Sequence, residues 1–180
     1  MKWIKRILLF LLTLVILFLI IAIFIKKEYR VEREIKISQP LEKVFSYVKL
    51  LKNQNEYSKW AGLDPGMKKF YKGKDGEKGF ISGWKSKKSD VGSGEQEIIN
   101  IIENKQIDYE IRFKEPFEST SNARLSLNSI SSNECRVVWS FDGKMNYPMN
   151  LMLLFMDFET MIGNDLQYGI NKLKRIIEKN

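Results

Sequence analysis

The first pattern along the chain is a continuous apolar run near the N-terminus. Residues 7–25 are apolar except for Thr13, and basic residues flank the run on both sides. At about 1.5 Å per residue, a helix of this length spans roughly 28 Å, close to the hydrocarbon thickness of a bilayer. A cleaved signal peptide has a shorter apolar core that ends in small residues, whereas isoleucine, phenylalanine and two lysines occupy residues 23–27. The pattern therefore predicts a single membrane-spanning helix through residues 7–25.

The basic residues around this run do not orient it in the membrane. Three of them lie in residues 1–6 and five lie in residues 26–36, and the rule that counts nearby Lys and Arg favours the cytoplasmic side for the richer flank. A short basic tail before the run favours the opposite orientation, so both orientations remain open.

We expect residues 1–28 to form a tail and anchor and residues 29–180 to form one folded domain.

Alternating and helical patterns follow in a fixed order. Residues 29–37 alternate apolar with charged positions, as in a half-buried strand, and Pro40 begins a short amphipathic helix that ends near residue 51. Residues 53–66 are loop-like. Further strands are predicted at residues 67–71, 80–85, 95–102, 107–114, 117–130 and 135–141. Their one-sided alternation indicates an antiparallel sheet with one face in water.

The period becomes helical after Pro148. Apolar residues recur at three- and four-residue steps from Met152 to Ile177, which predicts one helix of about 30 residues and near 45 Å. A sheet with one apolar face must cover that face, and this helix is the largest element available. The predicted fold is therefore α+β, a curved antiparallel sheet of about seven strands around a long C-terminal helix, preceded by a single transmembrane helix.

Short motifs lie along the chain in the same order as these predicted elements. They are Ile35-x-Ile37-x-x-Pro40-x-Glu42-x-Val44-Phe45, Trp60 with Asp64-Pro65, Gly79 with Trp84, Gly92-x-Gly94, Phe113 with Pro116-Phe117, Val138-Trp139-x-x-x-Gly143, and Leu154-Phe155-Met156-Asp157 followed by Ile162-Gly163, Gly169 and Leu173-Lys174. Over about residues 29–177 the chain resembles the polyketide cyclase/dehydrase and lipid-transport branch of the START-like (SRPBCC, helix-grip) superfamily. The resemblance implies an apolar cavity between sheet and helix. It implies a pocket and no particular reaction, because the family spans lipid carriers, cyclases, hydratases and chaperone activators.

Methionine is concentrated just before and within the predicted C-terminal helix. Five of the seven methionines lie within residues 145–161. Methionine side chains are flexible and suit surfaces that repack around varied apolar shapes. Two interpretations stay open: the stretch fills an ordinary core, or it also lines the mouth of the cavity and contacts a ligand.

The candidate ligand-binding residues are aromatic and methionine side chains expected on the concave face of the sheet or on the gripped helix. They are Trp60, Trp84, Tyr109, Phe113, Trp139, Phe141, Met149, Met152, Phe155 and Met156. Indole and phenol groups combine a large apolar body with one polar atom, which suits the lining of a pocket. Packing in the core is the alternative for each of them.

Composition excludes several kinds of chemistry. Histidine is absent and Cys135 is the single cysteine, which excludes His triads, most zinc sites and an internal disulfide. Of the acidic residues considered for general acid–base work, Asp157 and Asp165 are roughly 12 Å apart along a helix, too far to share a proton. No catalytic residue, metal or cofactor is therefore predicted. The net charge of +8 falls to +3 outside residues 1–27, so nucleic acid is not an expected partner.

These observations favour membrane-anchored binding of a hydrophobic small molecule, such as a lipid. Two alternatives stay open. One is a cyclase- or dehydratase-like enzyme that acts on a polyketide-type substrate and needs a buried acidic or tyrosine side chain in the cavity. The other is a protein-interaction module of the same fold, which would show a filled interior and an exposed apolar patch. The oligomeric state is not predicted.

Overall fold

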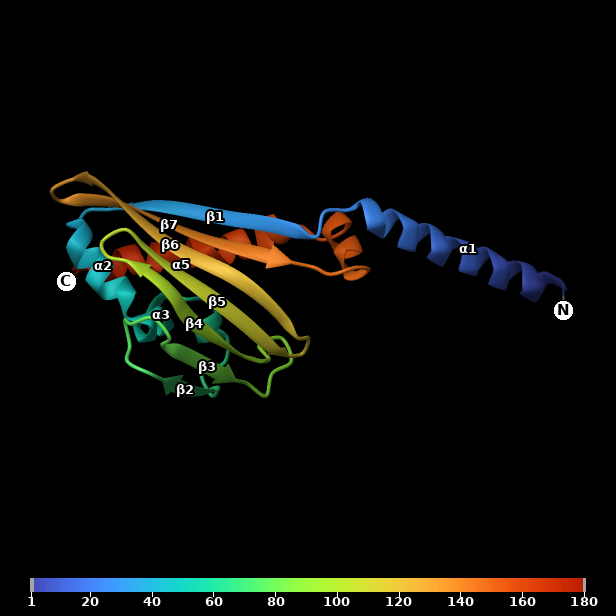
Figure 1. Ribbon diagram of the computed structural model, residues 1–180, viewed down its shortest axis with the longest axis horizontal. Coiled ribbons are helices and arrows are strands. Elements are labelled where there is room, and N and C mark those ends of the chain that lie inside the picture. The colour runs from blue at the N-terminus through green and yellow to red at the C-terminus, as the bar shows by residue number, and fades with distance from the viewer. Residues whose placement is uncertain (1, 180) are drawn as a thin grey trace.

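The N-terminal apolar run forms α1 (Lys2–Phe24), a helix that projects away from the rest of the molecule (Figure 1). The structure, a computed structural model, describes residues 2–179. Most α1 side chains are exposed, and Ala22 near the end of the helix is buried. By length and composition α1 could cross a membrane, a property that signal sequences share.

Seven antiparallel strands form one sheet in the order β1-β7-β6-β5-β4-β3-β2. The strands are β1 (Glu28–Ile37), β2 (Lys68–Lys72), β3 (Ile81–Lys85), β4 (Ser93–Ile102), β5 (Gln106–Glu115), β6 (Ser119–Ser131) and β7 (Glu134–Lys144). Strands β2 to β7 pair with their neighbours in sequence, whereas β1 pairs with β7 from Glu28 opposite Lys144 to Ile37 opposite Cys135. The predicted seven-stranded antiparallel sheet is confirmed.

The chain that connects β1 to β2 forms short helices, which cover the concave side of the sheet. They are α2 (Leu41–Lys49), the 3-10 turn η1 (Leu51–Asn53), α3 (Gln54–Tyr57) and α4 (Trp60–Leu63). A 3-10 helix η2 (Met149–Leu154) and the long helix α5 (Phe158–Lys179) follow β7. Helix α5 packs chiefly on β1, and the sheet curves around it (Figure 1). This arrangement is the helix-grip fold.

The predicted single helix from Pro148 onward is wrong, because the chain breaks it at Asp157. The Asp157 carboxylate accepts hydrogen bonds from the Thr160 backbone N–H at 2.9 Å and from the Thr160 hydroxyl at 2.7 Å. These bonds satisfy groups at the start of a new helix and hold the pKa of Asp157 below its usual value. Most of the methionine-rich stretch therefore lies in and around η2, ahead of the gripped helix.

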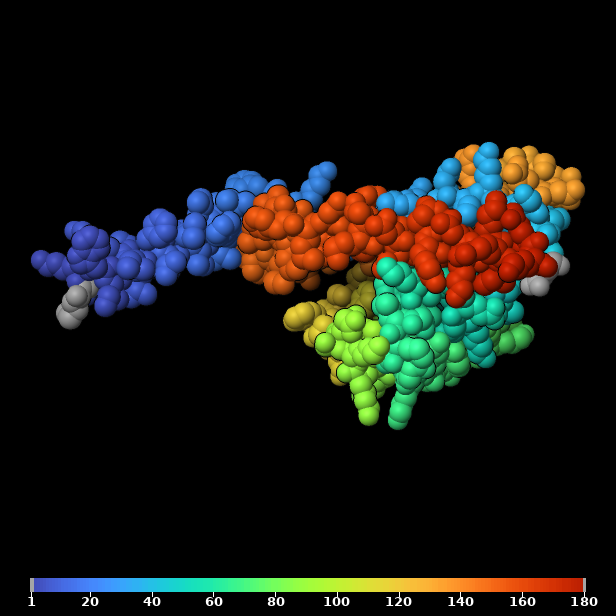
Figure 2. Space-filling view, turned by 180° about the vertical axis from the view of Figure 1, so that it is seen from behind, coloured from blue at the N-terminus to red at the C-terminus, as the bar shows by residue number. Residues whose placement is uncertain are grey.

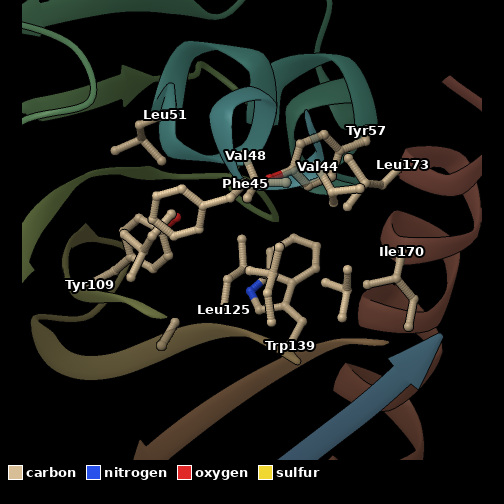
Figure 3. Packing of buried hydrophobic residues seen from close by; sticks show 14 of the residues in the cluster. Val44, Phe45, Val48, Leu51, Tyr57, Tyr109, Leu125, Trp139, Ile170 and Leu173 are labelled. Carbon is tan, nitrogen blue, oxygen red and sulfur yellow. The ribbon is translucent and has the colours of Figure 1, made fainter. Parts of the chain in front are cut away.

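The core lies where α5 and the short helices meet the concave face. Figure 3 shows the Trp139 indole of β7 at its centre, between α2 and α3 on one side and Ile170 of α5 on another. Helix α5 approaches this ring closely at Gly169, where an added Cβ would lie 2.6 Å from Cζ3 of Trp139. Only a residue without a side chain allows this approach.

Gly169→Ala is expected to destabilise the protein. Overpacking against the indole costs about 1–3 kcal/mol, which exceeds the gain of up to about 1 kcal/mol from the helix propensity of alanine. The free energy of unfolding, measured with denaturant, should therefore fall. Gly62→Ala in α4 is the matched control, because an added Cβ meets no atom within 4 Å there. Equal stability of the two variants would contradict the close packing of α5 on Trp139.

Candidate ligand-binding groove

The space between the sheet and α5 is filled where the sequence led us to expect a cavity. Trp139 is only 2% exposed, and its ring meets those of Tyr57 and Trp60 edge-on, at centroid distances of 5.7 and 6.4 Å. Such aromatic pairs stabilise a packed core. Tyr109 is also fully buried in this cluster. Trp139 and Tyr109 therefore occupy the volume that they were predicted to line.

Two other candidates form a separate pair on the outer strands. Trp84 of β3 meets Phe113 of β5 edge-on at 6.0 Å, across Gly94 of β4. The Trp84 indole N–H donates to the backbone carbonyl of Val91 at 3.3 Å. Both rings are half-buried, so this pair packs the sheet rather than opening a pocket.

An open hollow lies where the sheet and η2 meet the C-terminal end of α1. It has a volume of about 770 Å³, and we call it the α1 groove. Its lining comes from residues 24–26 and 28–31 on one side and from residues 153–159 on the other. Figure 2 shows the segment around η2, in orange, against the end of α1, in blue. The groove is thus built by two stretches of chain that are far apart in sequence.

The walls of the α1 groove are mainly apolar. The apolar lining residues include Phe24, Ile25, Leu153, Leu154 and Phe155. At the inner end, the Tyr29 ring lies 5.5 Å from that of Phe158. A row of aromatic rings therefore leads from the groove toward the core.

Charged side chains of both signs lie at the rim. Arg30 pairs with Glu32 and with Asp142, each at 3.0 Å, and Arg33 pairs with Glu159 at 2.7 Å. Exposed pairs of this kind contribute little to stability. Lys26, Glu28 and Asp157 also line the groove.

Asn150 fastens the two walls of the groove together. It is fully buried, and its side-chain amide donates to the carbonyl oxygens of Ala22 at 2.7 Å and Ile25 at 3.0 Å. The last carbonyl groups of a helix have no N–H donor within the helix. The Asn150 amide donates to two such carbonyl groups at the end of α1. The Met145 N–H adds a third bond, to the Lys27 carbonyl at 2.7 Å.

The remaining candidates divide around this groove. Phe155 and Met156 line it, whereas Met149 and Met152 lie in η2 outside the lining. Phe141 lies behind the groove, 6.4 Å from Tyr29. Trp60 is partly exposed at the edge of the core. Two of the ten predicted residues therefore line the α1 groove.

Sequence reasoning missed the lining from Phe24 to Val31 and the role of Asn150. The predicted boundary after residue 28 runs through one wall of the groove, and it assigns residues 24–28 to the anchor and the rest of the lining to the folded domain. A polar amide within the uncharged run at 145–156 was the available signal, because a buried Asn needs partners.

The acidic residues considered for catalysis are all engaged at the surface. Asp142 and Glu159 pair with arginines, Asp165 pairs with Lys59, and Asp157 caps α5. Burial raises the pKa of the Cys135 thiol to about 11. Within residues 2–179, no three His, Cys, Asp or Glu side chains are grouped to hold a metal ion.

Solved structures share this fold over most of the chain. A truncated norcoclaurine synthase from Thalictrum flavum has a TM-score of 0.63 at 9% identity, covering 85% of this chain and 95% of that chain. Ara h 8.0201 has a TM-score of 0.57 at 14% identity, covering 85% and 99%. Aha1 from Colwellia psychrerythraea, solved as a dimer, has a TM-score of 0.57 at 12% identity, covering 83% and 96%. At these identities the likeness shows the helix-grip fold alone. No model of a known protein family and no curated protein matches the chain.

Proposed function

We propose that this chain is a single-pass membrane protein that binds a hydrophobic, lipid-like molecule in the α1 groove. The observation that carries the proposal is the position of the groove, at the end of an exposed apolar helix that supplies part of its wall. A volume of about 770 Å³ falls within the range of about 300–1,000 Å³ that is usual for small-molecule sites.

The chemistry of the walls suits an apolar ligand. Each methylene group moved from water to an apolar surface contributes about 0.8 kcal/mol. Met156 adjusts to ligands of different shape because its side chain is flexible.

Two further observations support binding of a small molecule. The sequence motifs resemble those of the lipid-transport branch of START-like proteins, and one neighbour of the same fold, norcoclaurine synthase, was solved with a transition-state analogue bound. We favour binding over turnover, because each candidate carboxylate is engaged by a basic side chain or caps α5, and the cap lowers the pKa of Asp157. A general acid needs a raised pKa.

A pair of methionine substitutions tests this proposal. Met156 lines the groove, whereas Met161 is exposed one turn into α5 and does not line it. The full chain would be purified from membranes in mild detergent and examined by native mass spectrometry. Met156→Glu is expected to lose the co-purifying lipid, because a buried carboxylate is unfavourable next to an acyl chain, whereas Met161→Glu should retain it.

Equal retention by both variants would show that the lipid lies outside the groove. Absence of lipid from the unsubstituted chain, together with a stoichiometric co-purifying protein, would favour the interaction-module alternative instead.

A further inference from the structure

We infer that residues 146–156, the η2 segment, form a second membrane-embedded part of this chain, seated in the same leaflet as the C-terminal end of α1. The inference rests on the proposal that α1 spans the bilayer, and it adds a surface that the proposal does not require. The partner is the lipid of that leaflet.

The η2 segment has the composition of a membrane-contacting surface. No charged residue lies between Lys144 and Asp157. Large apolar side chains of the segment are nevertheless exposed, including Phe155 at 73%, Leu154 at 57% and Met149 at 54%. Clustered exposed apolar residues mark an interaction surface.

The depth of the segment follows from its bonds to α1. The Asn150 amide donates to the carbonyl oxygens of Ala22 and Ile25, which both belong to the apolar run at residues 7–25. These two residues lie within one helical turn, about 5 Å, of the end of that run. If α1 spans the bilayer, Asn150 is held at the boundary between hydrocarbon and headgroups, and its exposed neighbours lie in contact with lipid.

The backbone of the segment is suited to that boundary. Polar backbone groups without partners are costly in hydrocarbon, and several here are paired within the segment. Leu151 donates to the Pro148 carbonyl at 3.1 Å and Met156 donates to the Met152 carbonyl at 2.8 Å. The Asn150 side chain is wholly buried. The exposed side chains of η2 itself, Met149 and Leu154, are apolar.

This placement has a consequence for the α1 groove. Leu154, Phe155 and Met156 belong both to the η2 segment and to the groove lining. A lipid could therefore pass from the leaflet into the groove without crossing water.

The native cysteine makes a direct test practical. Cys135 is fully buried and its thiol has a pKa of about 11, so it reacts slowly with labelling reagents. The full chain would be placed in lipid nanodiscs with the environment-sensitive fluorophore NBD on one introduced cysteine. Met149→Cys reports on η2, Thr13→Cys on the middle of α1, and Ile130→Cys on the far end of β6. Met149 and Ile130 are exposed, so neither change disturbs the core, and Met149 does not line the α1 groove.

Lipids brominated on their acyl chains quench fluorophores that lie among them. We expect strong quenching at positions 13 and 149 and none at position 130. Quenching at position 13 without quenching at position 149 would overturn the inference and leave the proposed anchor intact. Absence of quenching at 13 would overturn the anchor, and the inference with it.

Discussion

Trp139→Ala is expected to lower the free energy of unfolding by about 3–5 kcal/mol, the usual cost of truncating a buried tryptophan. The indole is buried where β7 meets α5, α3 and α4, and its neighbours are held by their own packing. They can close the vacated volume only in part. The substitution should therefore create the interior cavity that the natural chain lacks at this position.

Indole added to the solution distinguishes this cavity from general damage. It should bind the vacated site and raise the unfolding midpoint of Trp139→Ala, because a ligand that binds only the folded state stabilises it. Trp60→Ala, which removes a partly exposed indole from the edge of the same cluster, is the matched control and should show a smaller loss without rescue. An unfolding midpoint of Trp139→Ala that indole raises no more than it raises that of the unsubstituted protein would contradict a filled interior.

Asn150→Leu is expected to release η2 from α1. The change removes both donors to the Ala22 and Ile25 carbonyls, and a buried carbonyl left without a partner costs about 1–3 kcal/mol. Since about 1.4 kcal/mol corresponds to tenfold in an equilibrium constant, local opening should increase by roughly tenfold or more. Hydrogen exchange of peptides covering residues 145–156, measured by mass spectrometry, reports this opening directly.

Asn146→Leu makes the same chemical change in the same segment, away from the carbonyls of α1. Its exchange should stay close to that of the unsubstituted chain. If Asn150→Leu and Asn146→Leu exchanged alike, the amide of Asn150 would not be what joins the two walls of the groove.

The sheet could be predicted from the sequence because each strand carries its own pattern. In β5, Ile107 and Tyr109 face the core while Asp108 and Glu110 face outward, and that alternation is local. The long C-terminal helix was also visible from its spacing, but its start was not. The helical spacing of apolar residues continues through Asp157, whereas the Asp157 side chain caps a new helix there. The spacing of apolar residues carries no information about such a cap.

The position of the hollow could not be predicted in the same way. Whether Trp139 fills or lines the space under the sheet depends on how closely α5 approaches, and that approach depends on Gly169. The α1 groove depends on contacts between residues 22–27 and 145–150, which no local pattern encodes. Phe155 and Met156 were predicted as ligand contacts on a gripped helix, and the structure places them in a groove wall instead.

The central claim is that the α1 groove holds a hydrophobic molecule. The most direct test is a native mass spectrum of the unsubstituted full chain, released from its own membrane in mild detergent. We predict an added mass close to one lipid-like molecule per chain that persists after the detergent is removed. A spectrum that shows only the bare chain, even after incubation with mixed lipids, would contradict the claim.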